Sequence, residues 1–189
     1  MLYLPPKWAH DGIAEGECMT YSVGFRSPKQ DELAREIFLR MSDAPDECPK
    51  EVVYKDPKQP AVANPGCIPA DFYQFAREAL KKAMAEPLAL ERALGEYMSD
   101  PKPNVWFEPA EDFAMIEGVE LNRRTRMLYD AKHIFINGES YLAGGKDAKL
   151  MQQLADTRRL SVREVQQFSD DALELLSSWV DAGWAHSVP

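Results

Sequence analysis

The dipeptide Asn137-Gly138 leaves the chain around it few options other than a β-hairpin. It lies between the apolar runs Ile134-Phe135-Ile136 and Tyr141-Leu142. An Asn-Gly pair readily adopts the positive φ angles of a two-residue hairpin turn, which most other residues avoid. The sequence therefore predicts two antiparallel strands within residues 132–142.

Helical patterns follow this hairpin to the end of the chain. A helix is expected over residues 146–156, and a capping box formed by Ser161 and Glu164 opens a short second one. A third helix starts near Ser169 and ends at Gly183. Strands and helices joined by tight turns are typical of a winged-helix-like domain, which we expect over residues 101–189, beginning at a proline-rich linker.

Residues 27–100 read as a helical region. Ser27-Pro28 is a suitable N-cap and first-turn pair, and apolar residues repeat at helical spacing over residues 72–83. Pro87 can open a third helix. Three helices alone enclose only a small hydrophobic core. We therefore expect this region to pack against a second copy of itself or against neighbouring domains.

Residues 1–26 read as strands. Between Cys18 and Phe25, small or polar residues alternate with apolar ones, which is the period of a strand with one apolar face. Residues 8–14 are a candidate hairpin partner. Such a strand suits either the wall of a pocket or an ordinary sheet with a solvated side.

Composition and charge exclude several classes of protein. The chain has 31 acidic and 22 basic residues, a net charge of −9, which argues against a nucleic-acid binder and fits a basic protein partner. No apolar run reaches the roughly 20 residues of a membrane span, and the N-terminus lacks a secretion signal. The three cysteines are widely spaced and predict reduced thiols. We therefore expect a cytoplasmic protein.

The chain has only three histidines, His10, His133 and His186, so few sites could use histidine chemistry. Their spacing alone predicts no metal site. His10 follows the run Leu-Tyr-Leu-Pro-Pro that begins at Leu2, and enters the second candidate strand.

That run and the sequence Met-Thr-Tyr-Ser-Val-Gly-Phe-Arg from Met19 together resemble the last part of the JmjC (cupin) core of bacterial ribosomal oxygenases. The family hydroxylates an arginine of a large-subunit ribosomal protein, using Fe(II), O₂ and 2-oxoglutarate. In this family a helical dimerisation region and a winged-helix-like domain follow the core. The resemblance thus implies an α+β chain with the end of a double-stranded β-helix (1–26), a dimerisation region (27–100) and a winged-helix-like domain (101–189).

The resemblance also implies roles for three residues. His10 matches the distal histidine of the two-histidine, one-carboxylate triad that holds iron, and Ser22 and Thr20 match hydroxyl groups that line the 2-oxoglutarate pocket. The His-x-Asp or His-x-Glu pair that completes the triad belongs upstream, and this chain starts too late to contain it. We therefore expect the chain alone to be inactive, as a piece of a longer protein or as a truncated one.

Two other functions stay open at this stage. One is a non-catalytic dimerisation and protein-binding module. The other is a winged-helix nucleic-acid binder, to which the basic clusters Arg123-Arg124-Thr125-Arg126 and Arg158-Arg159 would contribute. The alternative for these clusters is a solvated wing and helix end.

Overall fold

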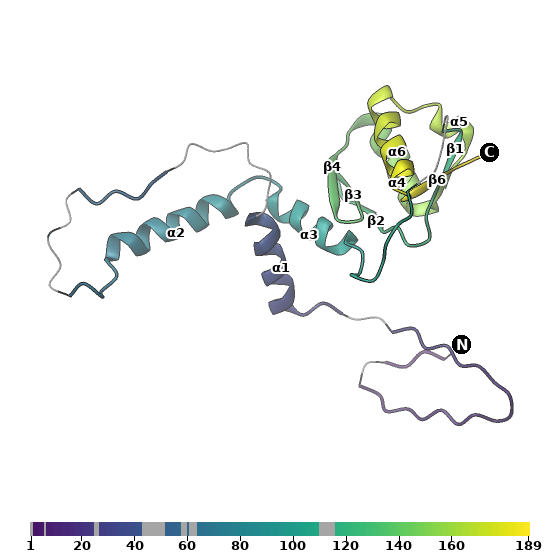
Figure 1. Cartoon of the computed structure of the whole chain (residues 1–189), viewed down its shortest axis with the longest axis horizontal. Helices are drawn as coiled ribbons and strands as arrows, with labels where there is room; N and C mark the ends of the chain where they lie inside the picture. Colours follow the sequence, from purple (N-terminus) through teal and green to yellow (C-terminus); the bar gives the residue numbers. More distant parts are fainter. Residues whose placement is uncertain are drawn as a thin grey trace.

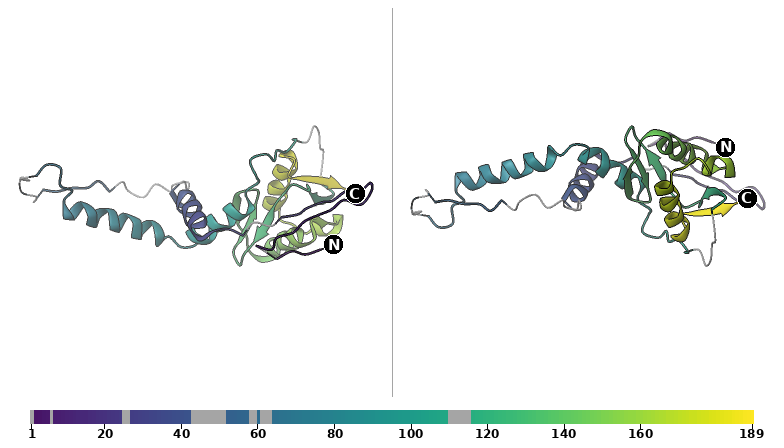
Figure 2. Two further views of the ribbon diagram at one scale, coloured as in Figure 1. Left: turned by 90° about the horizontal axis from the view of Figure 1, so that it is seen from below. Right: turned by 90° about the horizontal axis from the view of Figure 1, so that it is seen from above.

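A computed structural model describes residues 2–5, 7–24, 27–42, 52–57, 60, 64–109 and 116–189. It mixes helices and sheets: an extended N-terminal segment, three helices, and a C-terminal module of strands and helices (Figure 1). Figure 2 shows α2 extending away from this module in both views. Among the described residues, no helix has the length and apolar character needed to cross a membrane.

Two three-stranded antiparallel sheets form the frame of the C-terminal module. The first has the order β5-β1-β6, from β1 (Gly118–Leu121), β5 (Arg159–Leu160) and β6 (Ala185–Val188). The second has the order β2-β3-β4, from β2 (Met127–Tyr129), β3 (His133–Ile136) and β4 (Glu139–Leu142). Both sheets contribute buried side chains to one apolar core that also includes α4 to α6.

The three helices of this module begin and end close to where the sequence predicts. They are α4 (Gly145–Thr157), α5 (Val162–Val165) and α6 (Asp170–Asp181). The capping box of Ser161 and Glu164 is present, and Ser169 caps α6 by accepting a hydrogen bond from the Ala172 amide. Gly183, with φ of 73°, ends α6 where a left-handed residue is needed.

The predicted hairpin is confirmed. Asn137 and Gly138 have φ angles of 50° and 92°, as a two-residue turn with two left-handed residues requires. They join β3 to β4, with Ile136 paired opposite Glu139. β3 is the central strand of its sheet, and all four of its residues are buried.

The helical region is also confirmed, as α1 (Gln30–Ser42), α2 (Ala70–Met84) and α3 (Ala89–Ser99). The expected cap at Ser27 is wrong, because the Lys29 carbonyl accepts the first helical hydrogen bond, from Leu33. α1 packs on α3, whereas α2 has no buried residue and carries exposed apolar side chains. Part of the loop expected between α1 and α2 lies outside the described residues.

α3 lies directly on the β2-β3-β4 sheet. A Cβ added at Gly95 would lie 2.2 Å from Cε1 of Phe135, so only glycine allows this approach. At the end of α3, the Ser99 hydroxyl accepts a hydrogen bond of 3.1 Å from the Gly138 amide. The division between the helical and winged-helix-like regions at residue 100 remains a prediction, and the contacts of α3 cross it.

The linker after α3 is held against the C-terminal module. Arg126 donates to the Asp100 carbonyl at 2.7 Å, and Arg124 donates to the Trp106 carbonyl at 3.0 Å. Phe107 packs edge-on against Trp184 with 6.3 Å between ring centroids. These contacts fix where α3 enters the module.

Residues 2–24 differ from the expectation. The two strands predicted between residues 8 and 25 do not form in the described part of this segment, which runs extended, and Met19 and Tyr21 are 81% and 83% exposed. Phe25 and Arg26 lie outside the described residues. A strand needs a neighbour for its backbone hydrogen bonds, and within the described residues no strand pairs with this segment. The alternation of residues 18–24 therefore has no sheet to lie on.

The close contact between α3 and β3 gives a stability prediction. We expect Gly95→Ala to lower the free energy of unfolding by about 1–2 kcal/mol, because overpacking against Phe135 outweighs the roughly 1 kcal/mol that alanine gains over glycine in a helix. Urea denaturation followed by circular dichroism measures it. Gly66→Ala is the control, since Gly66 lies outside the helices and nothing lies within 4 Å of its added Cβ. Equal stabilities of the two variants would contradict the packing described here.

Candidate functional site

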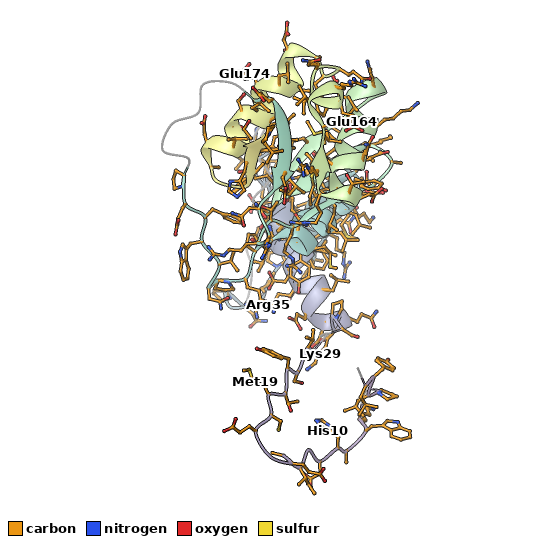
Figure 3. The ribbon with its side chains drawn as sticks, turned by 90° about the vertical axis from the view of Figure 1, so that its right-hand side faces the viewer. His10, Met19, Lys29, Arg35, Glu164 and Glu174 are labelled. Atoms are coloured by element: carbon orange, nitrogen blue, oxygen red, sulfur yellow. The ribbon has the colours of Figure 1, made fainter. Side chains whose placement is uncertain are left out.

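The three residues singled out by sequence lie in the extended N-terminal segment. His10, Thr20 and Ser22 are all exposed. Figure 3 shows His10 and Met19 on separate stretches of one open loop, apart from the helices and sheets. The described residues include no group of three histidine, cysteine or carboxylate side chains that could hold a metal ion. The structure therefore does not assemble these residues into a site, and their roles remain predictions.

The residues that the structure describes do not fit an iron site by themselves. Fe(II) binds weakly compared with other divalent metals and requires a full triad of protein ligands in enzymes of this type. His10 supplies one imidazole, with no carboxylate or second histidine grouped around it. No catalytic step follows from these residues alone.

A cavity with a volume of about 910 Å³ lies between the helices and the β3-β4 hairpin; we call it the groove. Three helices and the hairpin form its wall, through Arg40 of α1, Glu86–Leu88 before α3, Arg92 and Glu96 of α3, His133 of β3, residues 138–142 and Leu175 of α6. It joins segments that are far apart in sequence, so no motif could reveal it.

A polar network lies along the α3 side of the groove. The Ser140 hydroxyl donates to Glu96 at 2.6 Å, and Arg92 lies 3.6 Å from the same carboxylate oxygen. Arg40 donates to Asp100 at 2.5 Å. Sequence analysis missed these residues; the available signal was Arg92, which falls beside Ala89 and Ala93 on the buried side of α3.

Tyr141 on the hairpin stays neutral over a wide pH range. Burial, and then its hydrogen bond to the Glu139 carboxylate, raise the pKa of the Tyr141 phenol to about 12. Its ring packs edge-on against the buried Trp179, with 5.7 Å between centroids. The phenol is therefore a fixed, uncharged part of the groove wall.

His133, whose role the sequence left open, forms a buried pair with Asp130. The histidine is 4% exposed, and its Nδ1 lies 3.1 Å from Oδ2 of Asp130. The backbone amides of Lys132 and His133 also donate to Asp130, each at 2.7 Å. Burial raises the pKa of the Asp130 carboxyl, but these hydrogen bonds together lower it below its ordinary value. The pair thus anchors the turn before β3.

The basic clusters mostly bind the protein's own backbone. Arg124 and Arg126 donate to carbonyls of the linker, as described above. Arg158 donates to the carbonyls of Asn122 and Thr125, at 2.7 and 3.1 Å. The guanidinium of Arg124 also lies over the Trp106 ring, 5.7 Å from its centroid. Three arginines therefore hold backbone carbonyls, while Arg123, Arg124, Arg126 and Arg159 are exposed, which is compatible with the solvated alternative.

The helix that follows the α5-α6 turn carries only acidic charges. Asp170, Asp171, Glu174 and Asp181 are its charged residues, and all four are exposed. A helix in this position of a helix-turn-helix unit would need basic residues to approach DNA phosphates. The surface of α6 therefore offers no basic side chain to phosphate groups.

Comparison with known proteins places these features in a family. The family model "ROXA-like winged helix" matches residues 80–186, and the "JmjC domain" model matches residues 1–33. The ribosomal protein uL16 3-hydroxylase of Escherichia coli (strain K12) is 25% identical over 199 residues, covering 97% of this chain and 51% of that protein. The chain thus spans about half the length of this curated relative.

Solved structures show the same fold. The X-ray structure of E. coli ycfD matches with a TM-score of 0.64 at 19% identity, over 86% of this chain and 46% of that one. YcfD in complex with cobalt and succinic acid matches with a TM-score of 0.64 at 20% identity, over 86% and 47%. The complex of YcfD with cobalt and 2-oxoglutarate matches with a TM-score of 0.62 at 20% identity, over 86% of this chain and 47% of that one.

The Asp130 pair gives a pH-dependent prediction. We expect Asp130→Ala to lower the free energy of unfolding near neutral pH by about 2 kcal/mol, because two backbone amides and the buried His133 lose their acceptor. A carboxyl whose pKa is lowered by folding stabilises the protein above its ordinary pKa of 3.8 and loses this effect as pH falls through the folded value. The difference from wild type should therefore shrink in acid. Urea titrations at several pH values measure it, and a difference independent of pH would contradict a stabilising Asp130 carboxylate.

Proposed function

Because this chain belongs to the family of proteins with a ROXA-like winged helix, we propose that it forms the C-terminal part of an iron- and 2-oxoglutarate-dependent ribosomal protein hydroxylase. The observation that carries this proposal is the order of two family matches in one chain. A JmjC match over residues 1–33 precedes the winged-helix match over residues 80–186. The uL16 3-hydroxylase aligns with 97% of the chain, so the alignment takes in both segments.

His10 is the proposed iron ligand of the intact enzyme. The resemblance aligns it with the distal histidine of the triad, and its exposed position, with no other ligand grouped around it among the described residues, fits a ligand whose partners lie elsewhere. Ser22 and Thr20 are proposed to contact 2-oxoglutarate from the following strand. Bound iron and 2-oxoglutarate would supply the activation of O₂; the part of these three side chains is to bind and orient.

The proposed substrate is an arginine of a ribosomal protein, with the cytoplasm as the site of action. The acidic balance of the chain supports a basic protein partner, since opposite charges speed encounter and favour the correct orientation. The acidic surface of α6 and the three structural arginines argue against the nucleic-acid reading. Of the alternatives, a protein-binding module remains for the chain in isolation.

We further propose that residues 27–100 form a homodimer. Leu90, Leu94 and Met98 repeat every four residues along α3 and are 54%, 36% and 40% exposed, whereas the buried residues of α3 are Ala89, Ala93, Gly95 and Ser99. Apolar side chains at this spacing form a stripe suited to pack on another helix. A second copy of the chain offers the same stripe for a two-fold interface.

The hydroxylase proposal predicts a change in the ribosome. In the cell that produces this protein, we expect His10→Ala at the gene's own locus to leave the uL16-type protein one oxygen atom lighter. Loss of an outer-shell partner of a metal costs 10- to 100-fold, so loss of a ligand should reduce hydroxylation by about 100-fold or more. Mass spectrometry of intact ribosomal proteins measures it.

His186→Ala serves as the matched control, because His186 is exposed in β6 and lies outside the proposed ligand set. It should leave the mass of the ribosomal protein unchanged. Full hydroxylation in the His10 variant would contradict the role of His10. A wild-type strain whose ribosomal proteins carry no added oxygen would contradict the hydroxylase proposal itself.

The dimer proposal predicts the effect of one charge on α3. We expect Leu94→Glu to weaken self-association at least about tenfold, because a carboxylate would be buried between apolar side chains. Light scattering across a concentration series measures it. Leu128→Glu on β2 is the control, since Leu128 is 40% exposed and lies outside the stripe. A Leu94 variant that associates like wild type would contradict this interface.

A further inference from the structure

The groove contains two arginines whose hydrogen-bonding needs are unmet. Nε of Arg40 and Nη2 of Arg92 are buried and have no hydrogen-bond partner among the described residues. The side chain of Arg92 is 21% exposed, and its contact with Glu96, at 3.6 Å, is longer than a hydrogen bond. Buried donors without acceptors are costly, so both guanidinium groups would gain from acceptors in the groove, which a small movement of these partly exposed side chains (21% for Arg92 and 23% for Arg40) would allow them to reach.

The charges of the groove indicate which acceptors these are. Glu86, Glu96 and Glu139 line it, and Asp100 already pairs with Arg40. An added carboxylate or phosphate would meet these four carboxylates at close range, so a neutral acceptor fits better. Backbone carbonyls are such acceptors, and elsewhere in this chain Arg124, Arg126 and Arg158 all donate to carbonyls. A polypeptide backbone therefore suits the free arginine donors.

The other residues that line the groove indicate which side chains a bound polypeptide should carry. Glu86 and Glu139 are exposed at the groove, where they can pair with basic side chains. Leu142, 74% exposed, and Pro87 add apolar surface between them. A volume of about 910 Å³ has room for several residues of an extended peptide.

We propose that the groove between α3 and the β3-β4 hairpin binds an extended basic peptide segment of a partner protein. Arg92 and Arg40 donate to its backbone carbonyls, while Glu86 and Glu139 pair with its lysine or arginine side chains. The inference rests on the proposed function in one respect: a ribosomal protein substrate is the source of such a segment. It gives the winged-helix-like module a role in holding that substrate, and the binding itself requires no iron.

Fluorescence anisotropy of the full chain with a labelled ten-residue peptide, in which lysine or arginine alternates with alanine, tests the proposal. We expect saturable binding, and binding at least about tenfold weaker for the matched peptide with glutamate at the basic positions. The double variant Glu86→Gln with Glu139→Gln should weaken binding about three- to tenfold, as loss of two partly exposed ion pairs predicts. Arg92→Met should weaken it about tenfold.

Glu120→Gln is the matched control, because Glu120 is an exposed carboxylate of β1, in the other sheet. It should bind like wild type, and circular dichroism verifies the fold of each variant. If Arg92→Met fails to fold, NMR of the wild-type chain decides: the amides of Leu88, Ser140 and Leu142 should shift on peptide addition. The proposal is overturned if no binding occurs, if the glutamine variants match Glu120→Gln, or if these amides shift on self-association but not with peptide.

The outcome is separate from that of the hydroxylase proposal. Anisotropy needs no metal, cosubstrate or turnover, whereas the mass of the ribosomal protein reports turnover alone. If the chain does not bind the peptide but the ribosomal protein is hydroxylated, only the proposed role of the groove is contradicted. Groove binding without any hydroxylation would leave a basic-peptide binder and remove the enzyme.

Discussion

The contact between Gly95 of α3 and Phe135 of β3 determines how the two halves of this chain are joined. The phenyl ring occupies the space that any other side chain at position 95 would need, so helix and strand approach more closely than side chains normally allow. The docked helix then brings Ser99 to the hairpin turn and Glu96 to Ser140. The groove, the linker path and the exposed stripe on α3 all follow from this placement.

Much of the local structure could be predicted because it depends on neighbouring residues. Asn137-Gly138 determines a hairpin by its own φ preferences, and Ser161 with Glu164 closes a cap within one turn. The helix over residues 72–83 follows from spacing alone. What could not be predicted depends on distant residues: that α3 belongs against the hairpin, and that Arg124, Arg126 and Arg158 are bound to backbone carbonyls. A basic cluster has the same sequence whether its partner is phosphate or its own linker.

In the N-terminal segment the sequence pattern predicts a structure that the described residues do not form. Its alternation is that of a strand, and its residues match a JmjC model, yet residues 2–24 contain no strand in the described part of the chain. A strand is a property of a sheet, since its backbone hydrogen bonds belong to its neighbours. The predicted ligand His10 likewise has meaning only with partners that hold the same metal ion. The resemblance names candidate residues of a site, but a sequence alone does not supply the scaffold that would bring such residues together.

The central claim is that this chain is the C-terminal part of a JmjC-type hydroxylase with His10 as its distal ligand. Sequencing the genomic DNA upstream of the Met1 codon tests it most directly. The claim predicts an open frame of about a domain's length, on the order of 100–150 residues or more, encoding His-x-Asp or His-x-Glu. An in-frame stop close to Met1, with no such motif before it, would contradict the claim and leave a binding module as the function of the chain.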